Sequence, residues 1–341
     1  MKDAVKDIDY DSVVVIMATY NAKPYIVEQI DSILCQIGNS RLVIHDDGST
    51  DGTDKILLEY SKADHRVEII QSPPTGGAKE NFCYLMGQVD CEYLFFADQD
   101  DIWQPNKFSV IMNEIRKSES QYGKDMPILV HTDAILIDGT GNLISDSMWK
   151  YQKMSKKWSQ RLGLLMTQNI VTGCTMAINQ SLMKLVATIP DGAEMHDSWI
   201  ALVCCKYGKI ISLEEPLTRY RQHSKNVVGT QKNSAYYYAD RVQKMIKDYS
   251  LKGRAYNEDS RKRYIQAKEF CDVYSLNGDT KVSSFYMMSD MSYIPRIFTI
   301  LKYGYFRSDV ISNLSWILQP RILAAPFLFL INSKNAKHGR K

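Results

Sequence analysis

The stretch "SVVVIMATYN", Ser12 to Asn21, decides the fold. Its nearly continuous run of β-branched and apolar residues is typical of a strand that is buried on both faces, as in the middle of a parallel sheet. The run ends in Thr19, Tyr20 and Asn21, which can all form hydrogen bonds. Apolar residues at helical spacing follow between Pro24 and Gln36. We therefore expect a buried strand, a polar turn and a helix.

The same succession recurs further along the chain. "RLVIHDDGSTDGT" predicts a strand that ends in acids and a glycine turn before the next helix. The further expected elements are strands at Leu42–His45 and Val67–Gln71 and helices at Asp54–Ser61, Glu80–Gln88 and Pro105–Lys117. Strands that alternate with helices of this length indicate βαβ units, a mostly parallel sheet and right-handed crossovers.

The stretch "FFADQDDIW", Phe95 to Trp103, ends another such strand with the carboxylates of Asp98, Asp100 and Asp101. Charges of one sign this close raise one another's pKa unless a cation or hydrogen-bond donors compensate them. Asp100 or Asp101 could cap the following helix, although one acid suffices for a cap. The alternative is a divalent cation at the carboxyl end of the strand, where open α/β sheets hold their ligands.

Three strand ends therefore carry polar groups: "ATYN", "HDDGSTDGT" and "ADQDD". In a parallel sheet these ends lie along one edge and can form a single pocket. Acids cannot bind the phosphates of a nucleotide directly, but Mg²⁺ or Mn²⁺ takes carboxylate and phosphate oxygens together. Carboxylates away from the cation would meet ribose hydroxyls and the edge of the base.

Composition and cysteine usage restrict the class of protein. The 341 residues include seven cysteines without C-x-x-C spacing, which favours reduced thiols over disulfides or a zinc site. The opening "KDAVKDIDYDS" lacks the apolar core of a signal peptide, so we expect a cytoplasmic protein. Nothing indicates a nucleic-acid partner.

The alternation of strands and helices weakens after Lys117. We expect a strand or hairpin edge at Pro127–Asp138, another strand at Asn169–Asn179, and only amphipathic helices after Thr230. This pattern predicts a catalytic domain over 1–229 and a helical, basic extension over 230–341. Within the domain, 12–125 would bind the nucleotide and 126–229 would supply the acceptor side and a base.

The C-terminal end of the chain is basic. From Met291 to Lys341 eight lysines and arginines stand against one acid, Asp309, although the whole chain has a net charge of only +3. "ILAAPFLFLI", Ile322 to Ile331, is too short to span a bilayer but suits its interface, with the basic residues on anionic headgroups. The alternative is a core helix with a solvated basic tail.

The chain resembles the inverting GT-A glycosyltransferases of family 2. The resemblance lies in the order and spacing of five stretches: "ATYN", "DDGSTDGT", "ADQDD", "HDSW" and "YRQHSKNVVG". With "NIVTGC", the pieces are similar to the branch that contains bacterial rhamnosyltransferases of surface polysaccharides. The resemblance covers roughly residues 12 to 229. It implies a Rossmann-like, mostly parallel sheet flanked by helices, with a C-terminal helical extension.

By this resemblance Thr19, Tyr20 and Asn21 would border the nucleotide, Asp47 would accept from the imide N–H of the base, and Glu28 would support the same subsite. Lys79 and Asn81 would also contact the nucleotide, although a solvated helix start explains them equally well. An ordinary turn is the alternative for "DDGST".

The resemblance also implies a metal site and a catalytic base. Asp100 would bind Mn²⁺ or Mg²⁺ directly, with Asp98 toward the ribose and the surroundings of the metal, and His223 would complete the site as a neutral imidazole. Arg221 and Lys225 would face the diphosphate. Asp197 would be the general base, a role that is compatible with a helix cap. Asp101 would be an acceptor-side or supporting acid. Trp103 and Trp199 would offer flat apolar faces to an acceptor sugar, with packing as the alternative.

The implied reaction is metal-dependent, inverting transfer of a sugar, foremost L-rhamnose from dTDP-rhamnose, to a lipid-linked saccharide at the inner face of the cell membrane. A UDP-hexose such as UDP-galactose or UDP-glucose is the alternative donor. A non-catalytic protein that binds nucleotide sugars is a further alternative, which the presence of Asp100, Asp197 and His223 disfavours.

Overall fold

The computed structural model describes residues 12–186, 188–223, 249–307, 313 and 316–317. The chain divides into two compact units. The first comprises residues 1–162, 169–189 and 195–231, and the second comprises residues 163–168, 190–194 and 232–341. The expected domain boundary at residue 229 lies outside the described residues.

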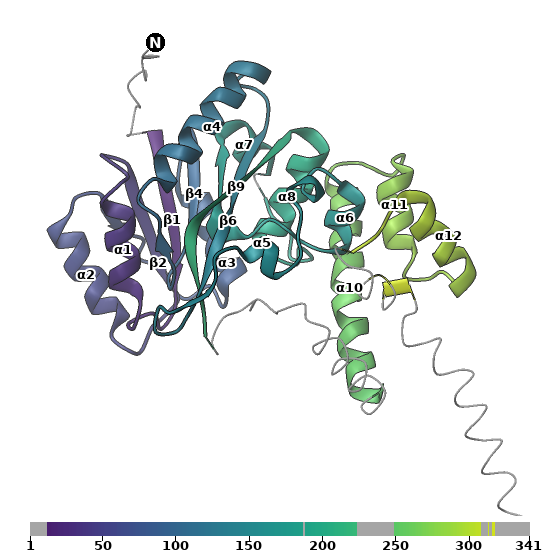
Figure 1. Cartoon of the computed structure of the whole chain (residues 1–341), viewed down its shortest axis with the longest axis horizontal. Coiled ribbons are helices and arrows are strands. Elements are labelled where there is room, and N and C mark those ends of the chain that lie inside the picture. The colour runs from purple at the N-terminus through teal and green to yellow at the C-terminus, as the bar shows by residue number, and fades with distance from the viewer. Residues whose placement is uncertain (1–11, 187, 224–248, 308–312, 314–315, 318–341) are drawn as a thin grey trace, which may run out of the picture. The chain divides into compact units, whose positions relative to one another are not determined.

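One mixed sheet forms the centre of the first unit, in the order β3-β2-β1-β4-β8-β6-β9-β5, with β7 paired to β6 (Figure 1). The strands that carry the predicted β-branched runs are mutually parallel. They are β1 (Val13–Thr19), β2 (Arg41–Asp46), β3 (Val67–Ile69) and β4 (Tyr93–Asp98). Their carboxyl ends consequently meet along one edge, as the sequence predicts.

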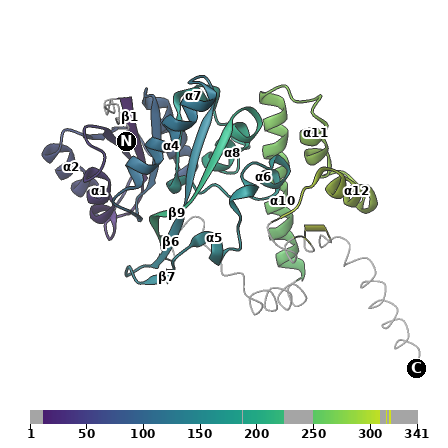
Figure 2. The same ribbon diagram turned by 45° about the horizontal axis from the view of Figure 1, so that its top comes forward.

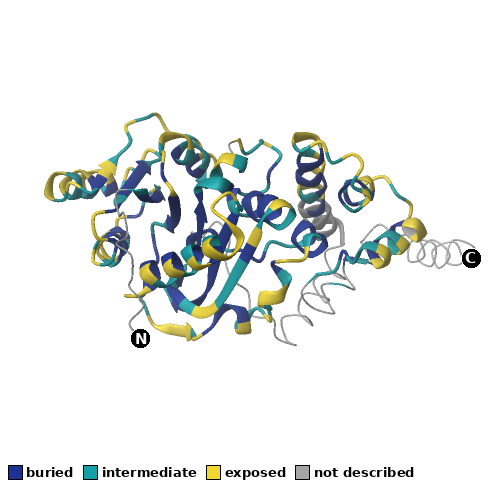
Figure 3. Cartoon of the chain, turned by 90° about the horizontal axis from the view of Figure 1, so that it is seen from above, coloured by how far each residue is buried: buried dark blue, intermediate teal, exposed yellow. Residues whose placement is uncertain are grey.

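Helices cover both faces of these strands. Alternate residues of a strand point to opposite faces, so Val13 and Val15 pack against α1 (Ile26–Leu34) and α4 (Lys107–Tyr122). On the other face α3 (Ala78–Gln88) contacts β1 and α8 (His196–Tyr207). β1, β2 and β4 are therefore buried along most of their length, whereas β3 at the edge of the sheet is partly exposed (Figure 3). This arrangement confirms the predicted α/β class with its mostly parallel sheet.

The second half of the sheet departs from simple alternation. β8 (Met176–Asn179) lies antiparallel between β4 and β6 (Ile128–Asp138), and β9 (Lys209–Gln222) runs parallel to β6. β5 (Ile102–Trp103) is antiparallel to β9, and β7 (Leu143–Ser145) makes a hairpin with β6 beside α5 (Met148–Tyr151), which Figure 2 shows.

The segment 127–138, expected as a strand or hairpin edge, forms the strand β6, which pairs with β7 and lies between β8 and β9 in the sheet. One expectation for this half needs correction. Only the last four residues of 169–179 form a strand, since Gly173–Thr175 is a 3-10 turn. The remaining helices of this unit are α2 (Thr53–Ala63) and α7 (Gln180–Val186).

The second unit is helical where it is described, as expected. It contains α6 (Leu162–Thr167, from its second residue on), α10 (Tyr249–Val273), α11 (Thr280–Met287) and α12 (Tyr293–Tyr303). Its core gathers aromatic rings: Phe285 packs against Tyr305 and Trp316, with ring centroids 5.1 and 6.2 Å away. Asp279 begins α11, because its carboxylate accepts from the backbone N–H groups of Lys281 and Val282.

None of the described helices combines the length and the apolar composition that are needed to cross a lipid bilayer. The apolar segment 322–331 lies outside the described residues.

Candidate active site

The ends of β1 and β2 are joined by side-chain hydrogen bonds. Thr19 Oγ1 donates to Asp46 Oδ1 at 2.9 Å. Asn21 adopts a left-handed backbone conformation with φ +51°, and its Oδ1 accepts from the backbone N–H of Thr50 at 2.9 Å while its own N–H donates to Ser49 Oγ at 2.7 Å. Asn tolerates this conformation better than most residues. Asn21 therefore links the turn after β1 to the turn after β2 through both its backbone and its side chain.

Tyr20 projects from this turn into solvent. Gln99 fixes its backbone from the end of β4, since the amide of Gln99 accepts from the N–H of Tyr20 at 2.5 Å and donates to its carbonyl at 3.1 Å. The side chain of Tyr20 is exposed. Its ring is therefore available to a ligand, and contact with a nucleotide stays a prediction.

Asp47 is held by the loop that precedes α3. Its Oδ1 accepts from the N–H and hydroxyl of Thr75, the latter at 2.8 Å, and the N–H of Gly76 lies 3.2 Å from both carboxylate oxygens. Oδ1 is thus fully engaged by the protein. A nucleobase N–H would have to bind at Oδ2 or displace the loop.

Asp100 and His223 are in direct contact within the acid cluster. His223 Nε2 lies 2.7 Å from Asp100 Oδ2, although the two residues are 123 positions apart. Both side chains are mostly buried, and the ring of Tyr25 stacks on His223 with centroids 5.1 Å apart. The structure therefore brings together the two predicted metal ligands.

Asp98 and Asp101 are held close to Asp100. Burial, together with the charges of Asp100 and Asp197, raises the pKa of Asp98 to about 7. Asp101 is fully buried, and this burial together with the charges of Asp100 and Asp98 raises its pKa well above the usual range. Its Oδ1 accepts from the N–H of Arg221 at 3.0 Å, but Oδ2 has no hydrogen-bond partner among the described residues. Burial among other acids therefore favours the protonated form of Asp101.

The donor set fits a hard divalent cation. Oxygen ligands with an imidazole suit Mn²⁺ or Mg²⁺, and Asp98, Asp100 and His223 supply them. Single ligand atoms of Asp98, Asp101 and Cys174 also lie within 4.8 Å of one another. Burial raises the pKa of the Cys174 thiol, so it stays protonated and is a poor ligand. The pair Asp100 and His223 is consequently the better candidate for direct contact.

A buried lysine lies behind the acids. Lys107 Nζ donates to the carbonyl of Cys174 at 2.6 Å and to Thr218 Oγ1 at 2.9 Å, and lies 4.1 Å from the centre of the Trp103 ring. Burial lowers its pKa to about 8, and the nearby acids act in the opposite direction. The sequence gives no signal for this residue, because a lysine in the first turn of α4 looks solvated.

Asp197 lies in the first turn of α8, two residues beyond Met195, which occupies the N-cap position. Its Oδ2 accepts from the N–H of Gly173 at 3.0 Å and its Oδ1 from the N–H of Ser198 at 2.6 Å. A Cβ on Gly173 would lie 2.9 Å from His196 Nε2, so only glycine permits this approach. The negative charge of Asp197 contributes to the raised pKa of Asp98, which places the proposed base beside the acid cluster.

The two tryptophans do not lie where an acceptor sugar could stack. Trp103 is buried against Phe95, with ring centroids 5.8 Å apart, and Trp199 is completely buried. Asp101, the third predicted acceptor-side residue, is also fully buried. The burial of these three side chains favours the alternatives, which are apolar packing for the two tryptophans and a supporting role for Asp101.

Two predicted nucleotide contacts are also buried. Asn81 bonds to His45 of β2, with Oδ1 3.0 Å from Nδ1 and Nδ2 donating to the backbone carbonyl at 3.2 Å. Arg221 donates to the carbonyl of Asp100 at 2.8 Å and to Glu28 Oε2 at 2.7 Å. Neither side chain is presented to a diphosphate or a base. Asn81 fastens α3 to the sheet, and Arg221 fixes the turn after β4.

The other predicted contacts lie at the periphery of the site. Glu28 has an exposed side chain and supports the site through its ion pair with Arg221. Lys79 lies 3.3 Å from Glu80 at the start of α3. Lys225 lies outside the described residues.

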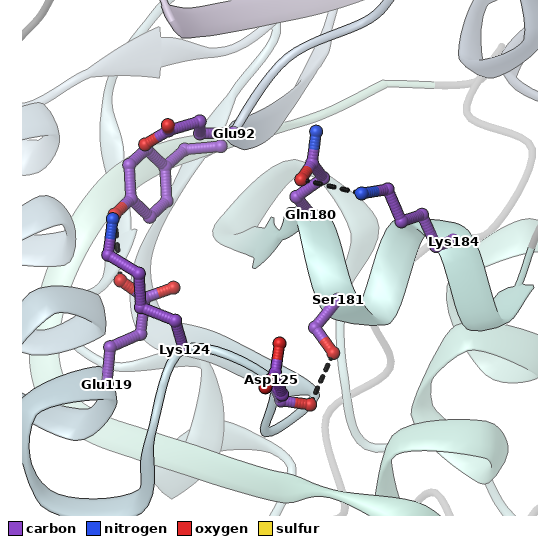
Figure 4. A pocket seen from close by; sticks show the side chains of 8 residues that line it. Glu92, Glu119, Lys124, Asp125, Gln180, Ser181 and Lys184 are labelled. Atoms are coloured by element: carbon purple, nitrogen blue, oxygen red, sulfur yellow. Dashed lines mark hydrogen bonds between the residues drawn. The ribbon is translucent and has the colours of Figure 1, made fainter.

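A polar pocket of about 290 Å³ lies at the opposite end of β4 (Figure 4). It is lined by Glu92, Tyr93, Glu119, Lys124, Asp125, Gln180, Ser181 and Lys184. Its polar groups bond to one another: Tyr93 donates to Glu119 at 2.8 Å and Lys184 to Gln180 at 2.9 Å. The pocket is therefore separate from the acid cluster, which begins where β4 ends.

A sheet of this type, with D-x-D acids, an imidazole and a further aspartate gathered at its carboxyl edge, defines a GT-A glycosyltransferase. Residues 14–123 match the domain described as "Glycosyl transferase family 2". The chain thus carries a family 2 domain and is a glycosyltransferase.

Curated relatives agree with this class. The chain is 25% identical to a glycosyltransferase of Haemophilus influenzae over 319 residues, covering 89% of this chain and 94% of that protein. It is 41% identical to the dTDP-rhamnosyl transferase RfbG of Shigella flexneri over 99 residues, which is 27% of this chain and 34% of that protein. The second match thus covers about a third of the length of the Shigella protein.

Solved structures show the same fold at low sequence identity. TarS 1–349 of S. aureus in complex with UDP-GlcNAc is 16% identical with a TM-score of 0.52, and the match covers 75% of this chain and 66% of that one. The mannosyltransferase PcManGT from Pyrobaculum calidifontis, in complex with GDP-Man and Mn²⁺, is 13% identical with a TM-score of 0.51, over 93% and 86% of the two chains.

Proposed function

We propose that the chain is an inverting, metal-dependent glycosyltransferase that moves a sugar from a nucleotide-diphosphate donor to an acceptor hydroxyl. One observation carries the proposal. Asp98, Asp100, Asp197 and His223 come from three distant parts of the sequence and gather at the carboxyl edge of the sheet. A structural role alone does not explain why so much negative charge is collected there.

Asp100 and His223 would hold Mn²⁺ or Mg²⁺, with Asp98 directed to the ribose and the surroundings of the ion. The bound ion would neutralise the charge of the leaving diphosphate. Tyr25 keeps the imidazole of His223 oriented by stacking, and Arg221 fixes the turn of Asp100 through its carbonyl. Thr19, Tyr20 and Asn21 would border the nucleotide, with Asp47 at the base.

Asp197 would act as the general base. Inversion requires a carboxylate on the face of the sugar opposite the leaving group. The acceptor hydroxyl gives its proton to the carboxylate while its oxygen bonds to the anomeric carbon, and the bond from that carbon to the diphosphate oxygen breaks. The backbone N–H groups of Gly173 and Ser198 donate to the carboxylate of Asp197 and orient it.

For the donor we propose dTDP-L-rhamnose, supported by the similarity of part of the domain to the Shigella enzyme. The acceptor would be a lipid-linked saccharide of a surface polysaccharide, which places the enzyme on the cytoplasmic face of the membrane with its basic C-terminal segment on anionic lipid. A UDP-hexose is the alternative donor.

The proposal is tested by incubating the purified chain with a panel of nucleotide sugars and a lipid-linked acceptor, with Mn²⁺ or Mg²⁺, and measuring release of nucleoside diphosphate. Release from dTDP-rhamnose that requires the cation supports the full proposal. Release only from UDP-hexoses would reject the rhamnose assignment. Binding of a nucleotide sugar without release from any donor would reject the enzymatic role.

A further inference from the structure

Helix α12 of the second unit directs apolar side chains outward. Ile294, Phe298 and Leu301 are 66%, 67% and 56% exposed. Their spacing of four and three residues places them on one side of the helix, labelled α12 in Figure 1. We call these three residues the α12 face. A helix of a soluble domain normally shows charged and polar residues on this side.

The opposite side of α12 is fixed by packing within its unit. Ile300 is completely buried, and the buried guanidinium of Arg296 lies 5.2 Å from the centre of the Trp316 ring. Gly304 ends the helix in a left-handed conformation with φ +70°, and the N–H of Tyr305 turns back to the carbonyl of Ile300. The helix therefore cannot rotate to hide the α12 face without losing this core.

Positive charge accompanies the exposed apolar face. Lys302 is exposed in the last turn of α12, and the helix contains no acid. The segment from Met291 to the end of the sequence has eight basic residues and one acid. Apolar side chains next to basic ones are the combination that binds the interface of an anionic bilayer.

We propose that the α12 face docks on an anionic lipid surface, with α12 lying in the plane of the interface. A second copy of the chain is a poorer occupant, because it would oppose two strongly basic segments. The biological setting of this inference rests on the proposed function, which places the acceptor in the membrane. The binding itself does not depend on sugar transfer.

The test measures flotation of the full chain with vesicles of phosphatidylcholine, with or without about one third phosphatidylglycerol. The variant F298E/L301E replaces two exposed apolar side chains by charged ones of the same sign as the lipid. The matched control is Leu143→Glu, because Leu143 is also 67% exposed but lies on β7 of the first unit. Circular dichroism melting and light scattering are recorded for all proteins.

We expect wild type and Leu143→Glu to float with the anionic vesicles, and F298E/L301E to lose on the order of 30-fold in partition without a fall in melting temperature. Unchanged binding of F298E/L301E would overturn the proposal, and so would a wild type that ignores anionic vesicles.

Two further outcomes would assign the α12 face to another occupant and also overturn the proposal. Loss of a dimer in F298E/L301E would indicate a second copy. A clear fall in its melting temperature would indicate that residues 318–341 of the chain itself cover the face. Release of nucleoside diphosphate, measured without lipid, reports separately on the proposed function.

Discussion

The ends of β2 and β4 both carry clustered acids, but the acids differ in how many hydrogen-bond donors surround them. At the end of β2, Asp46 accepts from Thr19 Oγ1, from the N–H of Ser49 at 2.9 Å and from Ser49 Oγ at 2.6 Å. At the end of β4, Asp98 and Asp101 lie among other acids and accept fewer hydrogen bonds. Their pKa values are therefore raised.

The difference teaches how to interpret such clusters. In "DDGSTD" the nearby Ser49 donates to Asp46 and the following Thr53 donates to Asp51, so these acids build a turn and are satisfied. The stretch "DQDD" has no comparable hydrogen-bond donors nearby, so compensation of its negative charge requires an external cation. The donors around a carboxylate, more than the number of carboxylates, distinguish a scaffold from a ligand site.

The largest effect is expected at the β4 end. Asp100→Ala should reduce sugar transfer below detection, because it removes the proposed ligand on which the leaving diphosphate depends. Its melting temperature should stay within a few degrees of wild type, since removing one of several like charges relieves repulsion. Nucleoside diphosphate release and thermal melting measure the two quantities. Undiminished turnover of wild type in excess EDTA would contradict the metal assignment.

Asp197→Asn should have the second-largest effect, slowing transfer by roughly 10²–10⁴-fold, because an amide cannot take the acceptor proton. Donor binding should barely change. The variant also loses one of two backbone hydrogen bonds, from Gly173 or Ser198, which costs about 1 kcal/mol of stability.

The measurements are single-turnover rate, donor affinity and melting temperature on the same preparation. Transfer near the wild-type rate would reject the catalytic assignment of Asp197.

At the β2 end the expected effect is on stability. Asp46→Ala removes three hydrogen bonds and should lower the free energy of unfolding by about 2 kcal/mol. Denaturant titration measures this quantity, with Asp100→Ala as the matched acid from the other strand end. If Asp100→Ala is the less stable of the two variants, the distinction between scaffold and ligand site fails.

The smallest effect concerns a buried histidine near the base. His196 packs between Phe82 and Phe96, and neither ring nitrogen has a hydrogen-bond partner among the described residues. Burial lowers its pKa from 6.5 to about 3. As the pH falls below 6.5, His196 takes up a proton in the unfolded chain but stays neutral in the folded chain. The stability that the neutral, buried His196 contributes is therefore fully present above pH 6.5 and is lost as the pH falls toward 3.

Between about pH 7.5 and pH 5.5 the loss from His196 should be about 1.4 kcal/mol. The raised pKa of Asp98 acts with the opposite sign, since the folded chain then binds the extra proton. Comparing wild type with His196→Leu at both pH values isolates the histidine. Equal pH dependence of the two proteins would show that His196 is protonated, or solvated, in the folded state.

The sequence predicts the strands of the nucleotide side because each is a short apolar run followed by a polar turn, as in β1 and β4. β9 escaped prediction because charged residues and Pro216 interrupt its apolar pattern, and its register with β6 shifts near that proline. Pairing with β6 on one side and β5 on the other compensates for weak local preference.

Among the site residues, those with an obvious charge were easier to predict than those whose role depends on burial. Asp100 and His223 were predicted to act together, and the structure brings them into contact. Trp199 and Asn81 have side chains that suit ligand binding, yet tertiary packing buries both. Lys107 shows the reverse: a residue type that is usually solvated lies behind the acid cluster.

β9 has a consequence for how the enzyme is made. It delivers Arg221 and His223 to acids that were synthesised 120 and 123 residues earlier. The family 2 match, 14–123, contains those acids but neither His223 nor Asp197. A nascent chain that has emerged only this far holds the acids without their partner ligand or the proposed base. If Asp197 and His223 have the proposed roles, sugar transfer requires that the sheet has gained β9.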